Sequence, residues 1–101
     1  MTDFETRTRP AQKQKPERPR MWKVILLNDD YTPREFVVSV LNAVFGMGPE
    51  KAYHVRATAH QKGTCVVAVY TRDVAETKAA QATDAGAAMG FPLTFTTEKE
   101  D

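Results

Sequence analysis

Three consecutive polar side chains, Asn28, Asp29 and Asp30, follow an apolar run at residues 25–27. An ordinary turn needs only one Asn or Asp, so three together call for another explanation. Side chains between a strand and a helix often face a ligand. Two carboxylates and an amide can hold a cation, either a metal ion or an ammonium group. The structural alternative is that Asp30 caps the turn while Asp29 is solvated.

A metal site needs further ligands, and the sequence offers few. The only histidines, His54 and His60, are separated by about 240° of rotation on one expected helix, so they cannot chelate together. Spacings typical of zinc or EF-hand sites are missing from the sequence. A receiver domain also ends its first strand with an acidic pair, but it needs an alternating β-α order. A receiver-like or metal-binding regulatory domain that uses Asp29 and Asp30 therefore stays the alternative function.

Covalent catalysis finds no support in the residues. Cys65 stands inside an apolar run, Ser39 falls on an expected helix, and no Ser-His-Asp or Cys-His arrangement is indicated. The sequence also has no Gly-rich phosphate loop. We therefore predict a binding module that is not an enzyme and needs no cofactor.

The composition limits the classes of partner that the protein is expected to bind. A chain of 101 residues suggests one domain, and 14 basic against 13 acidic side chains give no overall basic field for nucleic acid. No apolar run approaches the roughly 20 residues of a membrane helix. We expect a soluble, cytoplasmic, monomeric protein that binds neither nucleic acid nor membranes.

The first 20 residues differ from the rest of the chain. They hold six basic and three acidic side chains, three prolines and almost no large apolar side chain. Such a segment cannot bury enough surface to offset its ordering entropy. We predict a disordered N-terminal arm at 1–20, a folded core at 21–98 and a charged tail at 99–101.

The first helix has the clearest start signal. Thr32 fits the N-cap, Pro33 the first helical position and Glu35 the third, which together make a capping box. Asp73 and Glu76 repeat the cap pattern after a short turn at 71–73. The expected elements are a strand at 21–27, a helix from 33 to Gly46, a helix from 49 to near Gly63, a strand at 64–70, a helix from 73 to about 89 and a strand at 93–97.

This order, β-α-α-β-α-β, predicts an α+β open sandwich in which a three-stranded antiparallel sheet carries three helices on one face. A ribosomal-stalk-like interaction domain shares the same order, which is an analogy of fold alone.

Three blocks of the sequence carry a family resemblance: MWKVILLNDDYTPREFVVSVL, VYTRDVAETKAAQ and FPLTFTTE. In order and spacing they resemble the ClpS adaptor family, over about residues 21–98. The resemblance implies a non-enzymatic adaptor that binds proteins through a bulky hydrophobic N-terminal residue, which is Leu, Phe, Tyr or Trp. It also implies delivery of these proteins to a ClpA-type AAA+ unfoldase, which feeds the ClpP protease.

The resemblance assigns roles to three groups of residues. The α-amino group and first peptide unit of the substrate would be bound by Asn28, Asp29, Asp30, Thr32 and His60. The apolar pocket would be lined by Arg34, Val37, Val55, Arg56, Ala59 and Leu93. The N-terminal domain of the unfoldase would contact Asp73, Glu76, Thr77 and Lys78.

Three pocket positions depart from the family pattern. Arg34 and Arg56 stand where Met is common, and Ala59 replaces a larger aliphatic residue. We expect the arginine stems to line the pocket mouth while the guanidinium groups reach water. The hypothesis is a roomier pocket with an altered preference among bulky first residues. His60 can accept a hydrogen bond only when it is neutral, so binding would weaken as its ring protonates.

Overall fold

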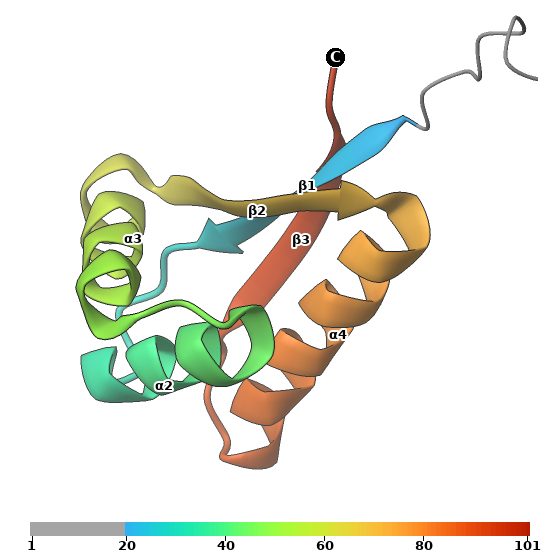
Figure 1. The fold of residues 1–101 in the computed structure, drawn as a ribbon. Helices are drawn as coiled ribbons and strands as arrows, with labels where there is room; N and C mark the ends of the chain where they lie inside the picture. Colours follow the sequence, from blue (N-terminus) through green and yellow to red (C-terminus); the bar gives the residue numbers. More distant parts are fainter. Residues whose placement is uncertain (1–19) are drawn as a thin grey trace, which may run out of the picture.

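The computed structural model describes residues 20–101 and contains three helices and one three-stranded sheet. Its elements in chain order are β1 (Met21–Leu27), α2 (Arg34–Phe45), α3 (Pro49–Lys62), β2 (Thr64–Thr71), α4 (Arg72–Ala88) and β3 (Thr94–Lys99). The expected α+β open sandwich is confirmed, with the helices layered on one side of the sheet (Figure 1). The predicted arm lies outside the described residues except for Arg20. Among the described helices, none is long and apolar enough to cross a membrane.

The first strand is the centre of the sheet. Its β-branched and aliphatic run favours a strand, and the strand order is β2-β1-β3 with both pairings antiparallel. Leu27 at the end of β1 pairs with Thr64 and with Thr94, so the following loop starts between the two edge strands. Val24 and Leu26 are buried on the face that the helices cover. The central strand therefore delivers residues 28–33 to the end of the helical layer.

Small side chains bring the longest helix close to the sheet. The buried residues of α4 are Ala75, Ala79, Ala82 and Gly86. This helix packs on all three strands, while α3 packs chiefly on β2 and α2 packs on α3 and α4. The first two helices end as expected, because Gly46 and Gly63 both adopt the left-handed conformation and donate to carbonyls of the last turn.

The expected capping box of α2 is wrong. The N-cap is Pro33, and no side chain of the described residues caps this helix. The hydroxyl of Thr32 instead donates to Asp29, and the carboxylate of Glu35 accepts from the hydroxyl of Tyr53. Both presumed capping groups thus have other partners, which are Asp29 in the same loop for Thr32 and Tyr53 on α3 for Glu35. The helix begins at Arg34, one residue later than expected.

The expected cap of α4 is also wrong. Strand β2 extends through Thr71 and the helix begins at Arg72, without the turn expected at 71–73. Glu76 accepts a 3.2 Å hydrogen bond from Arg72 Nε, and the Arg72 guanidinium lies 5.2 Å from the ring centre of Trp22. This pairing turns Glu76 away from a capping role. The last strand also runs further than expected, to Lys99, which pairs with Trp22 of β1.

Candidate functional site

The loop between β1 and α2 is organised by the carboxylate of Asp29. Its Oδ1 accepts hydrogen bonds from the backbone N–H groups of Tyr31, at 2.9 Å, and Thr32, at 2.7 Å. Its Oδ2 accepts from the hydroxyl of Thr32 at 3.0 Å. Thr32 is only 5% exposed, so these bonds satisfy a buried polar side chain. The loop is therefore shaped by Asp29, while Asp30 is exposed, which is the reverse of the structural alternative considered from the sequence.

The same loop is tied to the end of α3. The backbone N–H of Asn28 donates to the carbonyl of Gly63 at 2.9 Å. Ala59 and His60 lie in the last turn of α3, just before Gly63. A single backbone bond thus sets the polar loop beside the helix that carries the predicted histidine.

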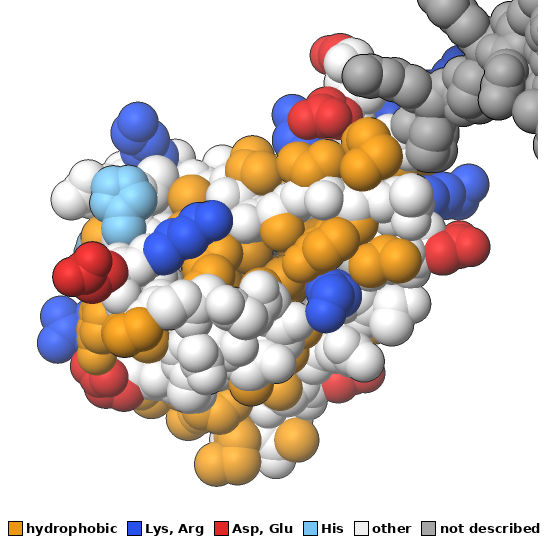
Figure 2. Space-filling model, in the orientation of Figure 1, with side chains coloured by type: hydrophobic (Ala, Val, Ile, Leu, Met, Phe, Trp, Pro, Cys, Tyr) orange, Lys and Arg blue, Asp and Glu red, His pale blue; other side chains and the backbone are white. Residues whose placement is uncertain are grey.

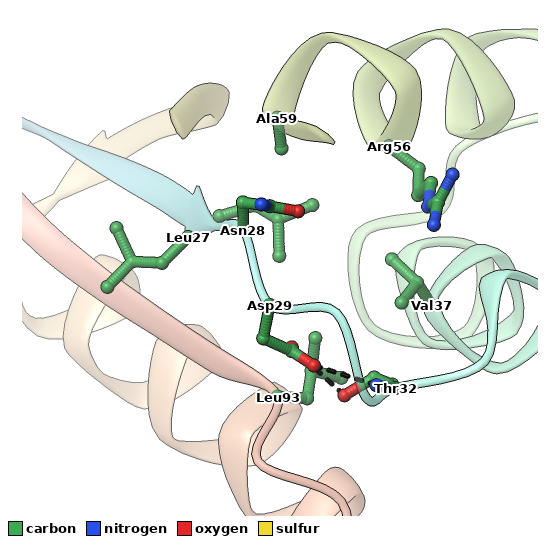
Figure 3. A pocket seen from close by; sticks show the side chains of 9 residues that line it. Leu27, Asn28, Asp29, Thr32, Val37, Arg56, Ala59 and Leu93 are labelled. Carbon is green, nitrogen blue, oxygen red and sulfur yellow. Dashed lines mark hydrogen bonds between the residues drawn. The ribbon is translucent and has the colours of Figure 1, made fainter. Parts of the chain in front are cut away.

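A cavity opens where this loop meets the helices (Figure 3). Its lining residues are Leu26, Leu27, Asn28, Asp29, Thr32, Val37, Arg56, Ala59 and Leu93. The polar members come from the loop, and the apolar members come from β1, α2, α3 and the segment before β3. A cavity with hydrogen-bonding groups on one side and apolar walls on the other fits a ligand that is polar at one end and apolar at the other.

The cavity is narrow in this structure. The volume accessible to the centre of a water molecule is about 10 Å³, which is room for about one water. Figure 3 shows the side chain of Arg56 reaching from α3 toward Val37 on α2. Arg56 is half-buried and makes no ion pair with any other described residue. The space that Ala59 leaves at the floor is therefore not open in the structure as it stands.

The structure brings together seven of the eleven residues expected to bind the substrate. The expected residues that line the cavity are Asn28, Asp29, Thr32, Val37, Arg56, Ala59 and Leu93, of which Asn28, Asp29 and Thr32 were expected to bind the amino group. The other four expected residues lie outside the lining: Asp30, Arg34, Val55 and His60. Val55 is buried in the core, whereas the other three are exposed.

Two lining residues were missed by sequence reasoning, Leu26 and Leu27. Both belong to the apolar run of β1, which reads as core rather than as pocket wall. Their position immediately before Asn28 is the signal that could have found them.

A second hollow lies on α4, where the partner surface was expected. It has a volume of about 250 Å³ and is lined by Asp73, Val74, Thr77, Lys78 and Gln81. Figure 2 shows apolar side chains gathered where β2 meets the first turns of α4. Val74, in the first turn of α4, is 42% exposed. The name α4 groove is used below for the hollow lined by Asp73, Val74, Thr77, Lys78 and Gln81.

The α4 groove contains three of the four residues expected to contact the unfoldase. Glu76 is outside it and pairs with Arg72 instead. Val74 and Gln81 were missed, although their helical spacing from Lys78 and Thr77 puts them on the same face. Lys78 has a further contact, because its ammonium group donates to the carbonyl of Val44 on α2 at 2.9 Å.

Hydrogen bonding and burial raise the pKa values of Tyr53, Cys65 and Tyr70, the last of these by burial alone. The pKa of Tyr53 is raised from its ordinary value of 10.0, first by its hydrogen bond to Glu35, then by desolvation and by the charge of Glu35. Burial raises the pKa of the Cys65 thiol, and the nearby charge of Lys62 opposes this shift. A thiol with a raised pKa is protonated near neutral pH, which makes it a poor nucleophile.

The alternatives from the sequence do not fit this structure. Among residues 20–101, no group of three His, Cys, Asp or Glu side chains is placed to hold a metal ion. The sheet is antiparallel throughout, whereas a receiver domain needs an alternating β-α order.

Comparisons with known proteins agree with this geometry. Residues 17–96 match the family model described as ATP-dependent Clp protease adaptor protein ClpS. The chain is 60% identical over 101 residues to ATP-dependent Clp protease adapter protein ClpS 1 of Bradyrhizobium diazoefficiens, with all of both chains covered. It is 61% identical over 99 residues to the protein of the same name from Rhodopseudomonas palustris, covering 98% of this chain and 96% of that one.

A solved structure shares both the fold and the sequence. The structure of Agrobacterium tumefaciens ClpS2 bound to L-phenylalaninamide has 60% sequence identity and a TM-score of 0.81, and it covers 82% of this chain and 100% of that chain. The expected resemblance is thereby confirmed by sequence and by structure. The chain belongs to the ClpS family of ATP-dependent Clp protease adaptor proteins.

Proposed function

We propose that this adaptor binds substrate proteins through a free, bulky hydrophobic N-terminal residue and delivers them to a ClpA-type AAA+ unfoldase. The observation that carries the proposal is the cavity, which joins the polar loop to apolar walls. The mechanism is binding, without a covalent step. As part of the proposal the protein works in the cytoplasm as a monomer, and sedimentation of the purified chain tests the second point.

The polar end of the cavity suits an α-ammonium group. Such a group has three donors and a positive charge, so it needs acceptors and negative charge nearby. The Asn28 side chain supplies an amide oxygen, and Asp29 supplies the charge. Asp29 already accepts three hydrogen bonds, and a carboxylate has about four acceptor sites, so one site remains for a ligand. A blocked N-terminus has neither the charge nor the three donors and would leave these acceptors unpaired.

Asp30 and His60 are assigned a supporting part in this proposal. Both are exposed, and both adjoin lining residues in the sequence, Asp29 and Ala59 respectively. Exposure leaves the His60 ring accessible to the first peptide unit of a substrate. The proposal keeps the expectation that a neutral His60 accepts a hydrogen bond there, so that protonation weakens binding.

The apolar end suits a bulky first side chain. Val37, Ala59 and Leu93 line it, each at most 5% exposed. The ligand of the Agrobacterium ClpS2 structure, L-phenylalaninamide, has a free α-amino group and a benzyl side chain, which correspond in kind to the polar end and the apolar end of this cavity. Because the cavity holds about one water in this structure, a bulky side chain enters only if a wall moves. Arg56 also lines the cavity, has the longest of the lining side chains and is only half-buried, so we assign the movement to it.

The α4 groove is the proposed contact for the unfoldase. It combines a negative and a positive side chain, Asp73 and Lys78, with the exposed Val74. An apolar centre with charges of both signs beside it is a common arrangement in protein interfaces. Glu76 lies next to the groove and is kept in the proposal as a residue of its rim.

Calorimetric titration with amino-acid amides tests the substrate part directly. L-Phenylalaninamide and L-leucinamide should bind, whereas N-acetyl-L-phenylalaninamide and glycinamide should not. The control variant is Asn42→Ala, because Asn42 is exposed on α2 and bonds to the carbonyl of Met47, away from the cavity lining. Equal binding of the acetylated and free amides would overturn the proposal.

The unfoldase part needs a separate test. Val74→Glu places a charge in the α4 groove without removing a hydrogen bond, since Val74 has an apolar side chain. We expect this variant to lose binding to the isolated N-terminal domain of a ClpA-type unfoldase and to keep its affinity for L-phenylalaninamide. Unchanged unfoldase binding would place the contact elsewhere on the molecule.

A further inference from the structure

Gly86 lies against Leu93, one of the residues that line the cavity. It is buried on the face of α4 that packs against the sheet, and Leu93 lies directly against it. A Cβ atom added at position 86 would lie 2.7 Å from Leu93 Cβ and 3.4 Å from Leu93 Cδ2. The first distance is far below an ordinary carbon–carbon contact of about 3.5–4.0 Å. Leu93 in turn lines the cavity.

A rotation of the Leu93 side chain cannot relieve this contact, because Cβ is fixed to the backbone. The backbone itself is also held. The carbonyl of Gly86 accepts hydrogen bonds from the N–H groups of Met89, at 3.0 Å, and Phe91, at 2.9 Å. The ring of Phe91 packs edge-on against Phe36 of α2, with the ring centres 5.0 Å apart. The segment that presents Leu93 is therefore anchored to both helices.

Backbone conformation does not explain this glycine. The glycines with positive φ in the described residues are Gly46, Gly63 and Gly90, so Gly86 has a conformation that other residues adopt freely. It lies inside α4, where glycine is less favourable for the helix than alanine. What glycine provides at this position is space for Leu93.

We propose that Gly86 is a positioning residue for substrate selection, because its missing side chain sets how far Leu93 stands into the cavity. Leu93 borders both Gly86 and the cavity, so a larger residue at position 86 moves Leu93 away from α4 and narrows the apolar end. Substrates with the longest side chain at their N-terminal residue lose the most affinity when the cavity narrows. The inference rests on the proposed function, since it assigns the cavity to the first side chain of the substrate.

The test compares two labelled peptides that differ only in their first residue, Phe or Leu, by fluorescence anisotropy. We expect Gly86→Ala to weaken the Phe peptide about tenfold more than the Leu peptide, the size of a modest overpacking effect. In a Leu93→Ala background, the same change at position 86 should alter the Phe-to-Leu affinity ratio less than about twofold, because a shortened side chain no longer reaches the cavity.

The matched control is Ala75→Gly, which weakens the other end of the same helix at a fully buried position. It should lower the unfolding temperature and leave the affinity ratio unchanged, which separates selection from stability. A folded Gly86→Ala protein with the wild-type ratio would overturn the inference and leave the proposed function standing. Failure of the wild-type protein to bind either peptide would overturn both.

Folding of the variants gives a second measurement of the same contact. If Gly86→Ala alone does not fold, recovery of a folded protein by Gly86→Ala with Leu93→Gly supports the steric contact, because only glycine at position 93 lacks the Cβ atom that the added methyl group meets. Failure of the double variant to fold, while Leu93→Gly alone folds, overturns the role given to Leu93.

Discussion

The carboxylate of Asp29 holds Thr32 by two groups at once, with 2.7 Å to its backbone nitrogen and 3.0 Å to its hydroxyl oxygen. This pairing fixes the loop before any ligand is present. It also holds the carboxylate at the lining of the cavity, where the Asn28 side chain lies as well. A binding site that is already ordered avoids part of the entropic cost of association. Asp29 thus has two separable duties, to shape the loop and to provide negative charge.

Substitutions at Asp29 separate these duties. Asp29→Asn keeps one acceptor oxygen for the two backbone N–H groups and removes the charge. We expect peptides with a free N-terminus to bind about ten- to a hundredfold more weakly, because a charge-assisted hydrogen bond is lost. Asp29→Ala should also destabilise the fold by about 1–3 kcal/mol, because Thr32 is left buried without its partner. Anisotropy and urea unfolding measure the two effects, and unchanged peptide binding by Asp29→Asn would contradict the role of the charge.

The two arginines that the sequence analysis assigned to the pocket are expected to behave differently. Arg56 lines the cavity, whereas the side chain of Arg34 is 62% exposed and lies 3.7 Å from Glu35. Arg56→Met should favour Trp and Phe over Leu peptides by about fourfold, the equivalent of roughly one buried methylene group. Arg34→Met is the matched control and should leave the ranking nearly unchanged. An altered ranking with Arg34→Met alone would return the specificity role to Arg34.

Lys78 is expected to support the fold as well as the partner surface. Its ammonium group donates to the carbonyl of Val44 and lies 5.8 Å from the ring centre of Tyr70. Lys78→Met should lower the free energy of unfolding by about 1 kcal/mol, because one hydrogen bond at the end of α2 is lost. Gln81→Met, in the same groove, serves as the control and should change stability less. Equal stability of the two variants in urea would show that the bond to Val44 contributes nothing.

Tyr53 gives a pH-dependent prediction. Its pKa is raised above 10.0, mainly by the hydrogen bond to Glu35, so the folded state favours the protonated phenol. The resulting stabilisation is fully present below pH 10.0 and is lost as the pH rises through the folded-state pKa. Unfolding in urea at about pH 8 and about pH 10.5 should therefore show a larger loss for wild type than for Tyr53→Phe. The same loss in both proteins would exclude Tyr53 as its source.

The sequence was most informative about the elements and least informative about their ends. Apolar spacing and glycine placed the three helices, because burial of one helical face is a local pattern. Thr32, Glu35 and Glu76 read as capping groups, yet each is hydrogen-bonded to another side chain in the structure. Capping competes with such contacts, and in the case of Glu35 the partner, Tyr53, lies on another helix. A contact between distant parts of the chain cannot be read from spacing alone.

In the candidate site, too, the sequence indicated the local features but not those that depend on packing between distant segments. The loop residues Asn28 and Asp29 were found from their types, and the distant walls Ala59 and Leu93 came from the family resemblance. The narrowness of the cavity depends on how α2 and α3 pack around it, and the contact between Gly86 and Leu93 depends on how α4 packs. No local pattern marks Gly86, because a glycine near the end of an Ala-rich helix reads as a weak position in that helix.

The most direct test of the account is one pair of labelled peptides that begin with Phe and differ only in acetylation of the α-amino group. Fluorescence anisotropy measures the affinity of the wild-type protein and of Asn28→Ala for both. The account predicts that wild type binds the free peptide, that acetylation abolishes this binding, and that Asn28→Ala weakens it. Equal affinity for the free and acetylated peptides would contradict recognition of the N-terminus by this cavity.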